Sequence, residues 1–196
     1  MKRKKYKVSP LIIIPARMGS VRLKNKNILP IKGIPMFVYV AKEAQKSKYN
    51  PKIWVSSESS KIKKICEKFN INFLKRPTKL SKSNVEKQLV VVHAVKLLSK
   101  KSKNNPPIVI SLQPNSPEFK SKDLDQAIQF FSNSFKNKKN KELISVGRDN
   151  RQNAAFRIMT FSAVFQKSLS TNIIIFKTNY TDIHNKRDYL KVKKKI

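Results

Sequence analysis

The 196-residue sequence predicts an α/β protein in which a mostly parallel sheet carries helices on both faces. Short apolar runs typical of buried strands alternate with segments of helical periodicity from residue 10 to residue 146. The first run, Leu11 to Ile14, is uninterrupted and rich in β-branched residues, as interior parallel strands usually are. Polar loops follow three strands directly, so they should meet at the carboxyl edge of the sheet, where such folds bind ligands.

Prolines, serines and one glycine bound the elements of the first half. Pro30, Gly33 and Pro35 mark a turn before a helix. A serine cluster at 56–60 ends one strand and begins the next helix, with Ser59 or Ser60 as its cap. The elements expected here are a strand over 11–14, a helix from near 35 to about 46, a strand over 52–55, a helix from 59 or 60 through 69 and a strand over 71–74.

The second half begins with another helix and a third buried-type strand. Pro106-Pro107 separates the two. Ser121 can cap the following helix, and Asp123 in its first turn complements the helix dipole. The elements expected here are a helix over 85–99, a strand over 108–112, a helix over 121–135, a strand over 142–146, extended segments at 156–161 and 171–176 and a short helix after His184.

The charge balance bears on the class of partner. Lys and Arg total 44 against 11 Asp and Glu, a net charge of +33 that attracts any polyanion. The lysines are spread along the whole chain, and aromatic residues are not interleaved with them as a base-stacking platform would require. Nucleic acid is therefore not favoured as the partner, although the charge does not exclude it.

Other compositional features point to a cytoplasmic protein. The single cysteine, Cys66, has the apolar phase of a helix and is expected in the core, which indicates a reducing compartment. We find neither the apolar region of a signal peptide nor a run long enough to span a membrane. We expect a soluble cytoplasmic protein with one domain over 1–196, without membrane association.

The loop after the first strand has the character of a ligand site. Arg17, Gly19, Ser20, Arg22 and Lys26 combine positive charge with backbone freedom, which suits the binding of phosphates. The alternative is a solvated basic loop in a lysine-rich protein.

The two other polar loops carry further candidates. Ser56 and Ser57 could contact a ligand or only cap the following helix. Gln113 could contact a ligand or hydrogen bond within its own loop.

With these loops placed, a family resemblance emerges. Pro15-Ala16-Arg17-x-Gly19-Ser20-x-Arg22, followed by Lys26-Asn27, resembles the nucleotide-binding signature of the acylneuraminate (CMP-sialic acid synthetase-like) cytidylyltransferases. Further similar motifs follow in the family's order, namely Gly33-Ile34-Pro35-Met36, Val55-Ser56-Ser57-Glu58-Ser59, Arg76-Pro77, His93-Ala94, Leu112-Gln113-Pro114-Asn115-Ser116-Pro117, Ile144-Ser145-Val146 and Asp182-Ile183-His184. The resemblance covers nearly the whole chain and implies a three-layer Rossmann-like nucleotidyltransferase fold.

The resemblance also implies a reaction and its residues. CMP would pass from CTP to an acidic sugar such as sialic acid, pseudaminic acid, legionaminic acid or a related nonulosonate, with release of pyrophosphate and with Mg²⁺ as cofactor. A homodimer is compatible with it. The implied catalytic residues are Arg17, Lys26 and Asp182, of which Asp182 is the metal ligand. The implied nucleotide-binding residues are Ala16, Arg17, Gly19, Ser20, Arg22, Lys26, Asn27, Ser56, Ser57 and Gln113. The implied substrate-binding residues are Gln113, Asn115, Arg151 and Gln152.

The chain departs from the family pattern in its last third. The segment between Val146 and Thr171, where the family recognises the sugar, is shortened. His184 stands where the family has a second metal-binding aspartate, and Glu58 replaces another aspartate. Two hypotheses follow: an active cytidylyltransferase, or a catalytically weakened relative that binds a nucleotide or another polyanion, including nucleic acid, without activating a sugar.

Overall fold

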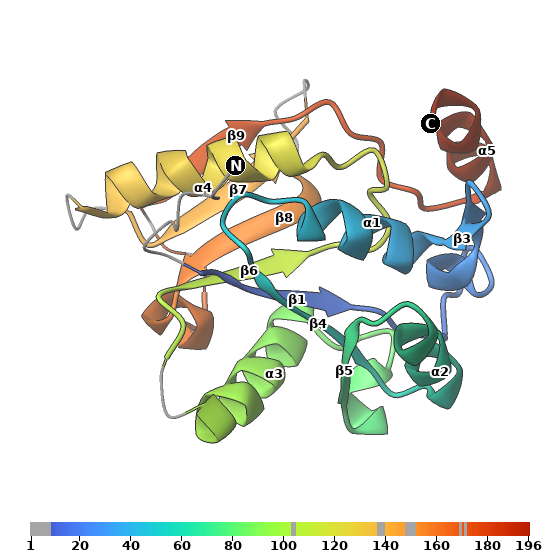
Figure 1. Cartoon of the computed structure of the whole chain (residues 1–196), viewed down its shortest axis with the longest axis horizontal. Helices are drawn as coiled ribbons and strands as arrows, with labels where there is room; N and C mark the ends of the chain where they lie inside the picture. The colour runs from blue at the N-terminus through green and yellow to red at the C-terminus, as the bar shows by residue number, and fades with distance from the viewer. Residues whose placement is uncertain (1–8, 103–104, 137–139, 148–151, 169, 171) are drawn as a thin grey trace.

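The computed structural model describes residues 9–102, 105–136, 140–147, 152–168, 170 and 172–196. Its main sheet has the strand order β5-β4-β1-β6-β8-β7-β9 (Figure 1). The strands are β1 (Leu11–Pro15), β4 (Lys52–Ser57), β5 (Asn72–Lys75), β6 (Ile108–Leu112), β7 (Glu142–Val146), β8 (Gln152–Thr160) and β9 (Ile173–Lys177). Only β8 runs against its neighbours β6 and β7 among these described strands. The prediction of a mostly parallel sheet is confirmed.

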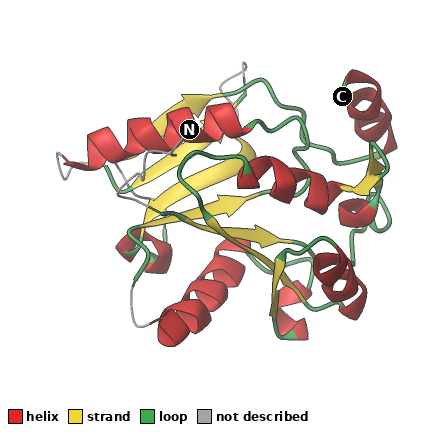
Figure 2. Cartoon of the chain, viewed as in Figure 1, coloured by secondary structure: helices red, strands yellow, loops and turns green. Residues whose placement is uncertain are grey.

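Helices cover both faces of this sheet, which gives the predicted three layers (Figure 2). The α-helices are α1 (Met36–Gln45), α2 (Ser60–Lys68), α3 (Lys87–Ser102), α4 (Ser121–Lys136) and α5 (Lys186–Lys195). The short 3₁₀ helices are η1 (Lys26–Ile28), η2 (Thr78–Ser81) and η3 (Ser162–Phe165). Residues of α1, α2 and α4 form one core cluster, and residues of α3 and η3 form another.

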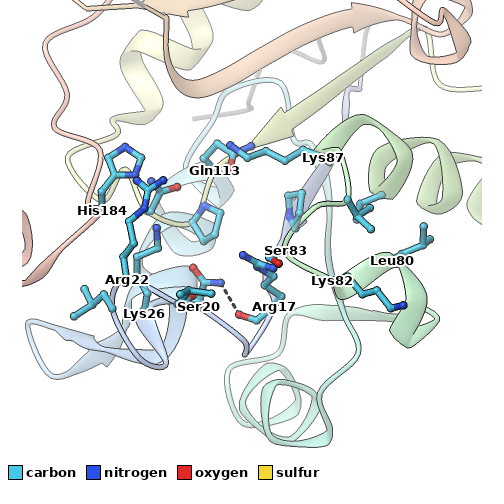
Figure 3. Close-up of a pocket in the computed structure, with 18 of the residues that line it drawn as sticks. Arg17, Ser20, Arg22, Lys26, Leu80, Lys82, Ser83, Lys87, Gln113 and His184 are labelled. Atoms are coloured by element: carbon cyan, nitrogen blue, oxygen red, sulfur yellow. Dashed lines mark hydrogen bonds between the residues drawn. The ribbon is translucent and has the colours of Figure 1, made fainter.

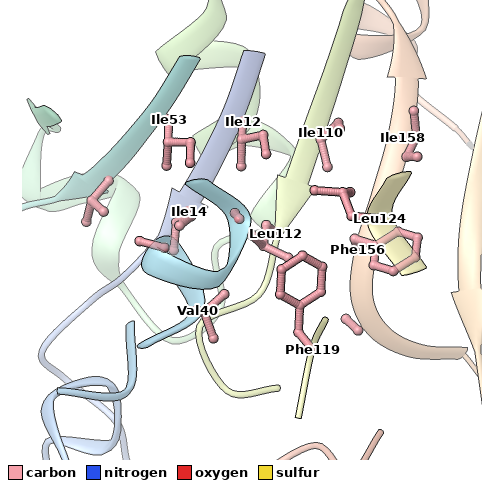
Figure 4. Packing of buried hydrophobic residues seen from close by; sticks show 14 of the residues in the cluster. Ile12, Ile14, Val40, Ile53, Ile110, Leu112, Phe119, Leu124, Phe156 and Ile158 are labelled. Atoms are coloured by element: carbon pink, nitrogen blue, oxygen red, sulfur yellow. The ribbon is translucent and has the colours of Figure 1, made fainter. Parts of the chain in front are cut away.

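Strand β1 shows why both faces are buried. Ile12 and Ile14 pack in the cluster that contains α1 and α4, with Ile110 and Phe156 of neighbouring strands (Figure 4). Ile13, which points the other way, packs in the cluster that contains α3. Alternate side chains of a strand point to opposite faces, so an uninterrupted apolar run is what a sheet covered on both sides needs.

The turn before α1 is a small hairpin that the sequence did not predict in detail. Strands β2 (Pro30–Ile31) and β3 (Ile34–Pro35) pair in antiparallel fashion. The two residues between them, Lys32 and Gly33, have φ angles of 46° and 78°. Positive φ at both central positions is what a tight type I′ hairpin requires, and glycine adopts it without steric cost.

Several predicted bounds needed correction. Strand β8 begins at Gln152, four residues before the extended segment expected at Phe156. The intervening residues have low strand propensity, but Gln152 pairs with Val146 of β7 and the carbonyl oxygen of Ala155 accepts a hydrogen bond from the amide of Gln113 at 2.8 Å, which holds this stretch against the sheet. Helix α3 begins at Lys87 instead of Val85 and continues beyond the expected end at Ser99.

Other local predictions are confirmed. Ser59 caps α2 by accepting a hydrogen bond from the amide of Ile62. Cys66 is fully buried. Within the part of the chain that the structure describes, we find no helix with the length and apolar character needed to cross a bilayer. That 1–196 forms a single domain stays a prediction.

Candidate functional site

A pocket of about 560 Å³ opens beyond the carboxyl ends of β1, β5 and β6 (Figure 3). Three polypeptide segments contribute most of its wall: the loop after β1, the segment between β5 and α3, and the loop after β6. The lining residues are Pro15, Arg17, Ser20, Val21, Arg22, Leu23, Lys26, Asn27, Arg76, Leu80, Lys82, Ser83, Val85, Lys87, Val90, Gln113, Pro114, Asn115 and His184. The pocket therefore lies where a mostly parallel sheet is expected to bind its ligand.

The lining is strongly cationic. Six lysines and arginines contribute to it, and none of the described lining residues is an aspartate or a glutamate. The cations are Arg17, Arg22, Lys26, Arg76, Lys82 and Lys87. A concave surface of one sign focuses the electrostatic field, so this pocket favours an anion with several charges.

Asn27 shapes the loop after β1 from within. This residue is only 5% exposed, and its side-chain amide nitrogen donates a hydrogen bond to the carbonyl oxygen of Arg17 at 2.8 Å. The amide of Ala16 donates to the carbonyl oxygen of Ser56 at 3.0 Å, which ties the start of the loop to β4. These two bonds fix the backbone from which Arg17 reaches the pocket.

Lys26 sits in a crowded cationic environment. Its ammonium donates a hydrogen bond to the carbonyl oxygen of Ile183 at 2.8 Å. Burial lowers the pKa of Lys26, the positive charge of Lys87 lowers it further, and Asp182 opposes both effects. The bond to Ile183 joins the loop after β1 to the segment that leads into α5.

Asp182 is not among the residues that line the pocket, whereas His184, two residues later, is one of them. Oδ1 of Asp182 accepts a hydrogen bond from the hydroxyl of Ser116. Burial raises the pKa of Asp182, while the bond from Ser116 and the charges of His184, Lys87 and Lys26 oppose that rise. Burial also lowers the pKa of Lys87, and Asp182 opposes this shift. Asp182 is thus electrostatically coupled to two cations that line the pocket.

The structure brings together seven of the predicted site residues in the pocket wall. These are Arg17, Ser20, Arg22, Lys26, Asn27, Gln113 and Asn115. Gln113 and Asn115 are only 7% and 8% exposed. The roles of these seven residues in ligand binding stay predictions. All seven lie in the wall of the pocket, where a bound ligand could contact them.

Other predicted residues lie outside the wall. Ala16 is buried and Gly19 is exposed on the loop, and neither lines the pocket. Ser56 and Ser57 are fully buried and do not line the pocket. Ser57 accepts a hydrogen bond from the amide of Ser59 at 3.2 Å, whereas the hydroxyl of Ser56 has no partner among the described residues. The structure thus gives Ser57 a local role in the turn before α2.

The structure describes only part of the predicted sugar-binding segment. Arg151 lies outside the described residues. Gln152 is the first residue of β8.

Sequence reasoning assigned no role to three cations of the lining. Arg76 directly follows β5, so the rule that placed Gln113 at the carboxyl edge would have placed it there too. Lys82 lies between η2 and α3, and Lys87 is the first residue of α3. No sequence signal distinguishes these two lysines from the many on the surface.

Fold and pocket together define an α/β protein with a cationic pocket at the carboxyl edge of a mostly parallel sheet, the place where such folds bind their ligands. A family model described as cytidylyltransferase matches residues 11–186. The chain belongs to the cytidylyltransferase family, which confirms the resemblance found in the motifs.

Curated relatives come from two kinds of cytidylyltransferase. The chain is 27% identical over 191 residues to N-acylneuraminate cytidylyltransferase of Escherichia coli O18:K1:H7, covering 93% of this chain and 44% of the relative. It is 27% identical over 128 residues to 3-deoxy-manno-octulosonate cytidylyltransferase of Bartonella tribocorum, covering 65% of this chain and 50% of the relative. The chain spans about half the length of these curated relatives.

Solved structures agree on the fold. One is CMP:2-keto-3-deoxy-manno-octonic acid synthetase complexed with CTP, with a TM-score of 0.76, 15% identity and coverage of 95% of this chain and 97% of that chain. Another is a cytidylyltransferase from Leptospira borgpetersenii, with a TM-score of 0.70, 17% identity and coverage of 95% and 85%. These likenesses establish the Rossmann-like nucleotidyltransferase fold.

Proposed function

We propose that this chain transfers CMP from CTP to a hydroxyl group of an acidic sugar and releases pyrophosphate. The observation that carries the proposal is the pocket at the carboxyl edge of the sheet, with six cations and without an acidic side chain among its described lining residues. Family membership supports the choice of CTP. The sugars named for the relatives, N-acylneuraminate and 3-deoxy-manno-octulosonate, are both acids, which supports an acidic acceptor.

The proposed reaction is a displacement at the α-phosphorus of CTP. The sugar hydroxyl oxygen forms a bond to this phosphorus, and the bond from the phosphorus to the bridging oxygen of the β-phosphate breaks. Pyrophosphate leaves with that electron pair, and the hydroxyl proton passes to solvent. In such transfers the protein mainly positions the groups and neutralises the developing charge.

The cations of the loop after β1 suit this task. Arg17, Arg22 and Lys26 would hold the triphosphate and stabilise negative charge as it builds on the leaving pyrophosphate. The hydrogen bond from Lys26 to Ile183 and the one from Asn27 to Arg17 hold this loop in place before the ligand arrives. The loop is therefore preorganised for a polyanion.

The acceptor would occupy the part of the pocket near the end of β6. Gln113 and Asn115 are buried there and line the wall, so their amides can fix the orientation of sugar hydroxyls. Arg151 and Gln152 remain candidates for the carboxylate of the sugar. Sialic, pseudaminic, legionaminic and octulosonic acids are all acceptors to be tested.

Magnesium could be held here through a single protein carboxylate, that of Asp182. Among the residues that the structure describes, no three His, Cys, Asp or Glu side chains are grouped so that they could hold a metal ion. Magnesium commonly binds through one or two carboxylates together with substrate phosphates, so Asp182 alone could serve as the protein ligand. When bound, the ion would withdraw charge from phosphate oxygens. His184 is a poor ligand for magnesium, which prefers oxygen.

The test is release of pyrophosphate. Purified protein is incubated with CTP, Mg²⁺ and a panel that contains the four sugar acids, with Arg17→Ala as control. We expect release that requires both CTP and one of the acids, and much less from the control. No release above the control with any acid would contradict the proposal, and CTP binding without release would favour the catalytically weakened relative.

A further inference from the structure

The carboxylate of Glu58 contacts two of the segments that contribute to the pocket, the loop after β1 and the segment between β5 and α3. On one side, its Oε1 accepts a hydrogen bond at 2.9 Å from the amide of Met18, which belongs to the loop after β1. On the other side, its Oε2 accepts hydrogen bonds from Nη2 of Arg76 at 3.1 Å and from the hydroxyl of Ser81 at 2.8 Å. These contacts connect segments that are far apart in the sequence.

Ser81 extends this connection to Arg17. Its hydroxyl accepts a hydrogen bond from Nε of Arg76 at 2.9 Å while it donates to Glu58. Its carbonyl oxygen accepts a hydrogen bond from Nη1 of Arg17 at 3.3 Å. The orientation of the Arg17 guanidinium therefore depends on a residue that Glu58 itself holds.

Charge explains why a carboxylate is needed at this position. Arg17 and Arg76 both line the pocket; burial lowers the pKa of the Arg76 guanidinium, and the positive charge of Arg17 lowers it further, as expected for neighbouring like charges. Glu58 acts in the opposite direction and favours the charged form of Arg76. Without the negative charge of Glu58, the repulsion between these two cations would be less compensated.

Glu58 is suited to this task because it is ionised and well shielded. The side chains of Glu58 and Arg76 are 17% and 2% exposed. Burial by itself would raise the pKa of Glu58, but hydrogen bonds from Met18 and Ser81 and the charge of Arg76 outweigh it and bring the pKa below its ordinary value. A shielded, charge-assisted network of this kind is stronger than a surface ion pair.

We propose that Glu58 is a positioning residue, whose carboxylate holds the loop at 17–27 and the segment at 76–83 at the separation that lets Arg17 and Arg76 face one ligand. The inference rests on the proposed function for the identity of that ligand, CTP. A merely structural role would lower thermal stability but leave the affinity of the folded protein for CTP unchanged.

The test uses two substitutions at this position and one matched control. Glu58→Gln keeps the shape but removes the charge and turns an acceptor into a donor facing other donors. Glu58→Asp keeps the charge on a side chain that is one methylene shorter. Glu67→Gln makes the same charge change on the exposed face of α2, where Glu67 pairs with Lys63.

Calorimetric titration with CTP, well below each melting temperature, gives the first readout. We expect CTP to bind about tenfold more weakly to Glu58→Gln, because charge-assisted hydrogen bonds are lost. The Glu58→Asp variant should recover most of that loss, and the Glu67→Gln control should bind as the wild type does. Wild-type affinity in Glu58→Gln, with only a lowered melting temperature, would overturn the inference.

Amide hydrogen exchange without ligand gives a second readout that does not depend on the proposed function. The Met18 amide donates to Glu58, so a peptide containing Met18 should exchange faster in Glu58→Gln and not in Glu67→Gln. Unchanged exchange at Met18 would overturn the inference. If the wild type does not bind CTP at all, the proposed function fails, and exchange still decides whether Glu58 holds the loop.

Discussion

The ammonium of Lys26 donates a hydrogen bond to the carbonyl oxygen of Ile183 at 2.8 Å, across 157 residues of sequence. Ile183 also contacts Asn115, because its backbone amide donates a hydrogen bond to the carbonyl oxygen of Asn115 at 2.9 Å. Ile183 is therefore the point where the loops after β1 and β6 meet the segment before α5. This junction places Asp182 beside the cations of the pocket.

Replacement of Lys26 by methionine should abolish most activity. The change keeps the apolar stem but removes the ammonium that contacts Ile183 and lines the pocket. We expect kcat/KM for CTP to fall by about a hundredfold or more, as when one preorganised donor to a developing charge is lost. Lys24→Met is the matched control, because Lys24 is exposed and does not line the pocket. Equal kinetics for the two variants would contradict the role of Lys26.

Replacement of Asp182 by asparagine should remove the contribution of magnesium to CTP binding. The amide oxygen can still accept the hydrogen bond from Ser116, so the local structure should persist. In the wild type, we expect Mg²⁺ to increase the rise in melting temperature that CTP causes. In the variant, CTP with and without Mg²⁺ should give the same melting temperature. An undiminished magnesium effect would exclude Asp182 as the ligand.

The ion pair between Arg157 and Glu142 should be a stability determinant away from the pocket. Nη2 of Arg157 lies 2.8 Å from the Glu142 carboxylate, whose side chain is fully buried. Arg157→Met leaves that charge uncompensated and should lower the free energy of unfolding by about 3 kcal/mol, measured in urea. The double variant Arg157→Met with Glu142→Leu should be more stable than the single one. A loss below about 0.5 kcal/mol in the single variant would show that the pair contributes little.

Cys66 should be inert in the native protein. Burial, aided by the charge of Glu67, raises the pKa of the thiol to about 12. A thiol-reactive chromogenic disulfide at pH 8 should therefore modify the folded chain at least about a hundredfold more slowly than the chain in urea. Because the folded-state pKa is raised, the stability that the protonated thiol contributes is lost only as the pH rises from the ordinary value of 9.0 toward 12. Rapid modification of native protein would show that the helix opens readily.

A comparison of the affinities for CTP and ATP distinguishes a nucleotide-specific pocket from general attraction to polyanions. At fixed ionic strength we expect tighter binding of CTP than of ATP, since the two carry the same triphosphate and charge alone cannot distinguish them. Equal affinities, together with duplex DNA binding that weakens about a thousandfold over a modest rise in salt, would favour the polyanion hypothesis. The net charge of +33 makes this control necessary.

Much of the fold could be predicted because its signals are local. The apolar run at 11–14 and the serine cap of α2 depend on neighbours in sequence, and both appear as expected. The start of β8 could not be predicted this way, because the contacts that hold it, Gln152 with Val146 of β7 and Ala155 with the amide of Gln113, form only in the folded sheet.

The same distinction between local sequence signals and contacts formed in the folded protein applies to the candidate site. By itself the sequence determined the parallel sheet, the family and the cationic loop around Arg17, because strand patterns and motif spacing are written along the chain. Only the tertiary structure decided that Arg76 and Lys87 join this loop in one pocket, that Ser56 is buried and does not line it, and that Glu58 contacts both Met18 and Arg76. The physical reason is that hydrogen bonds, burial and charge coupling depend on distances in space, and the fold sets those distances between residues far apart in sequence.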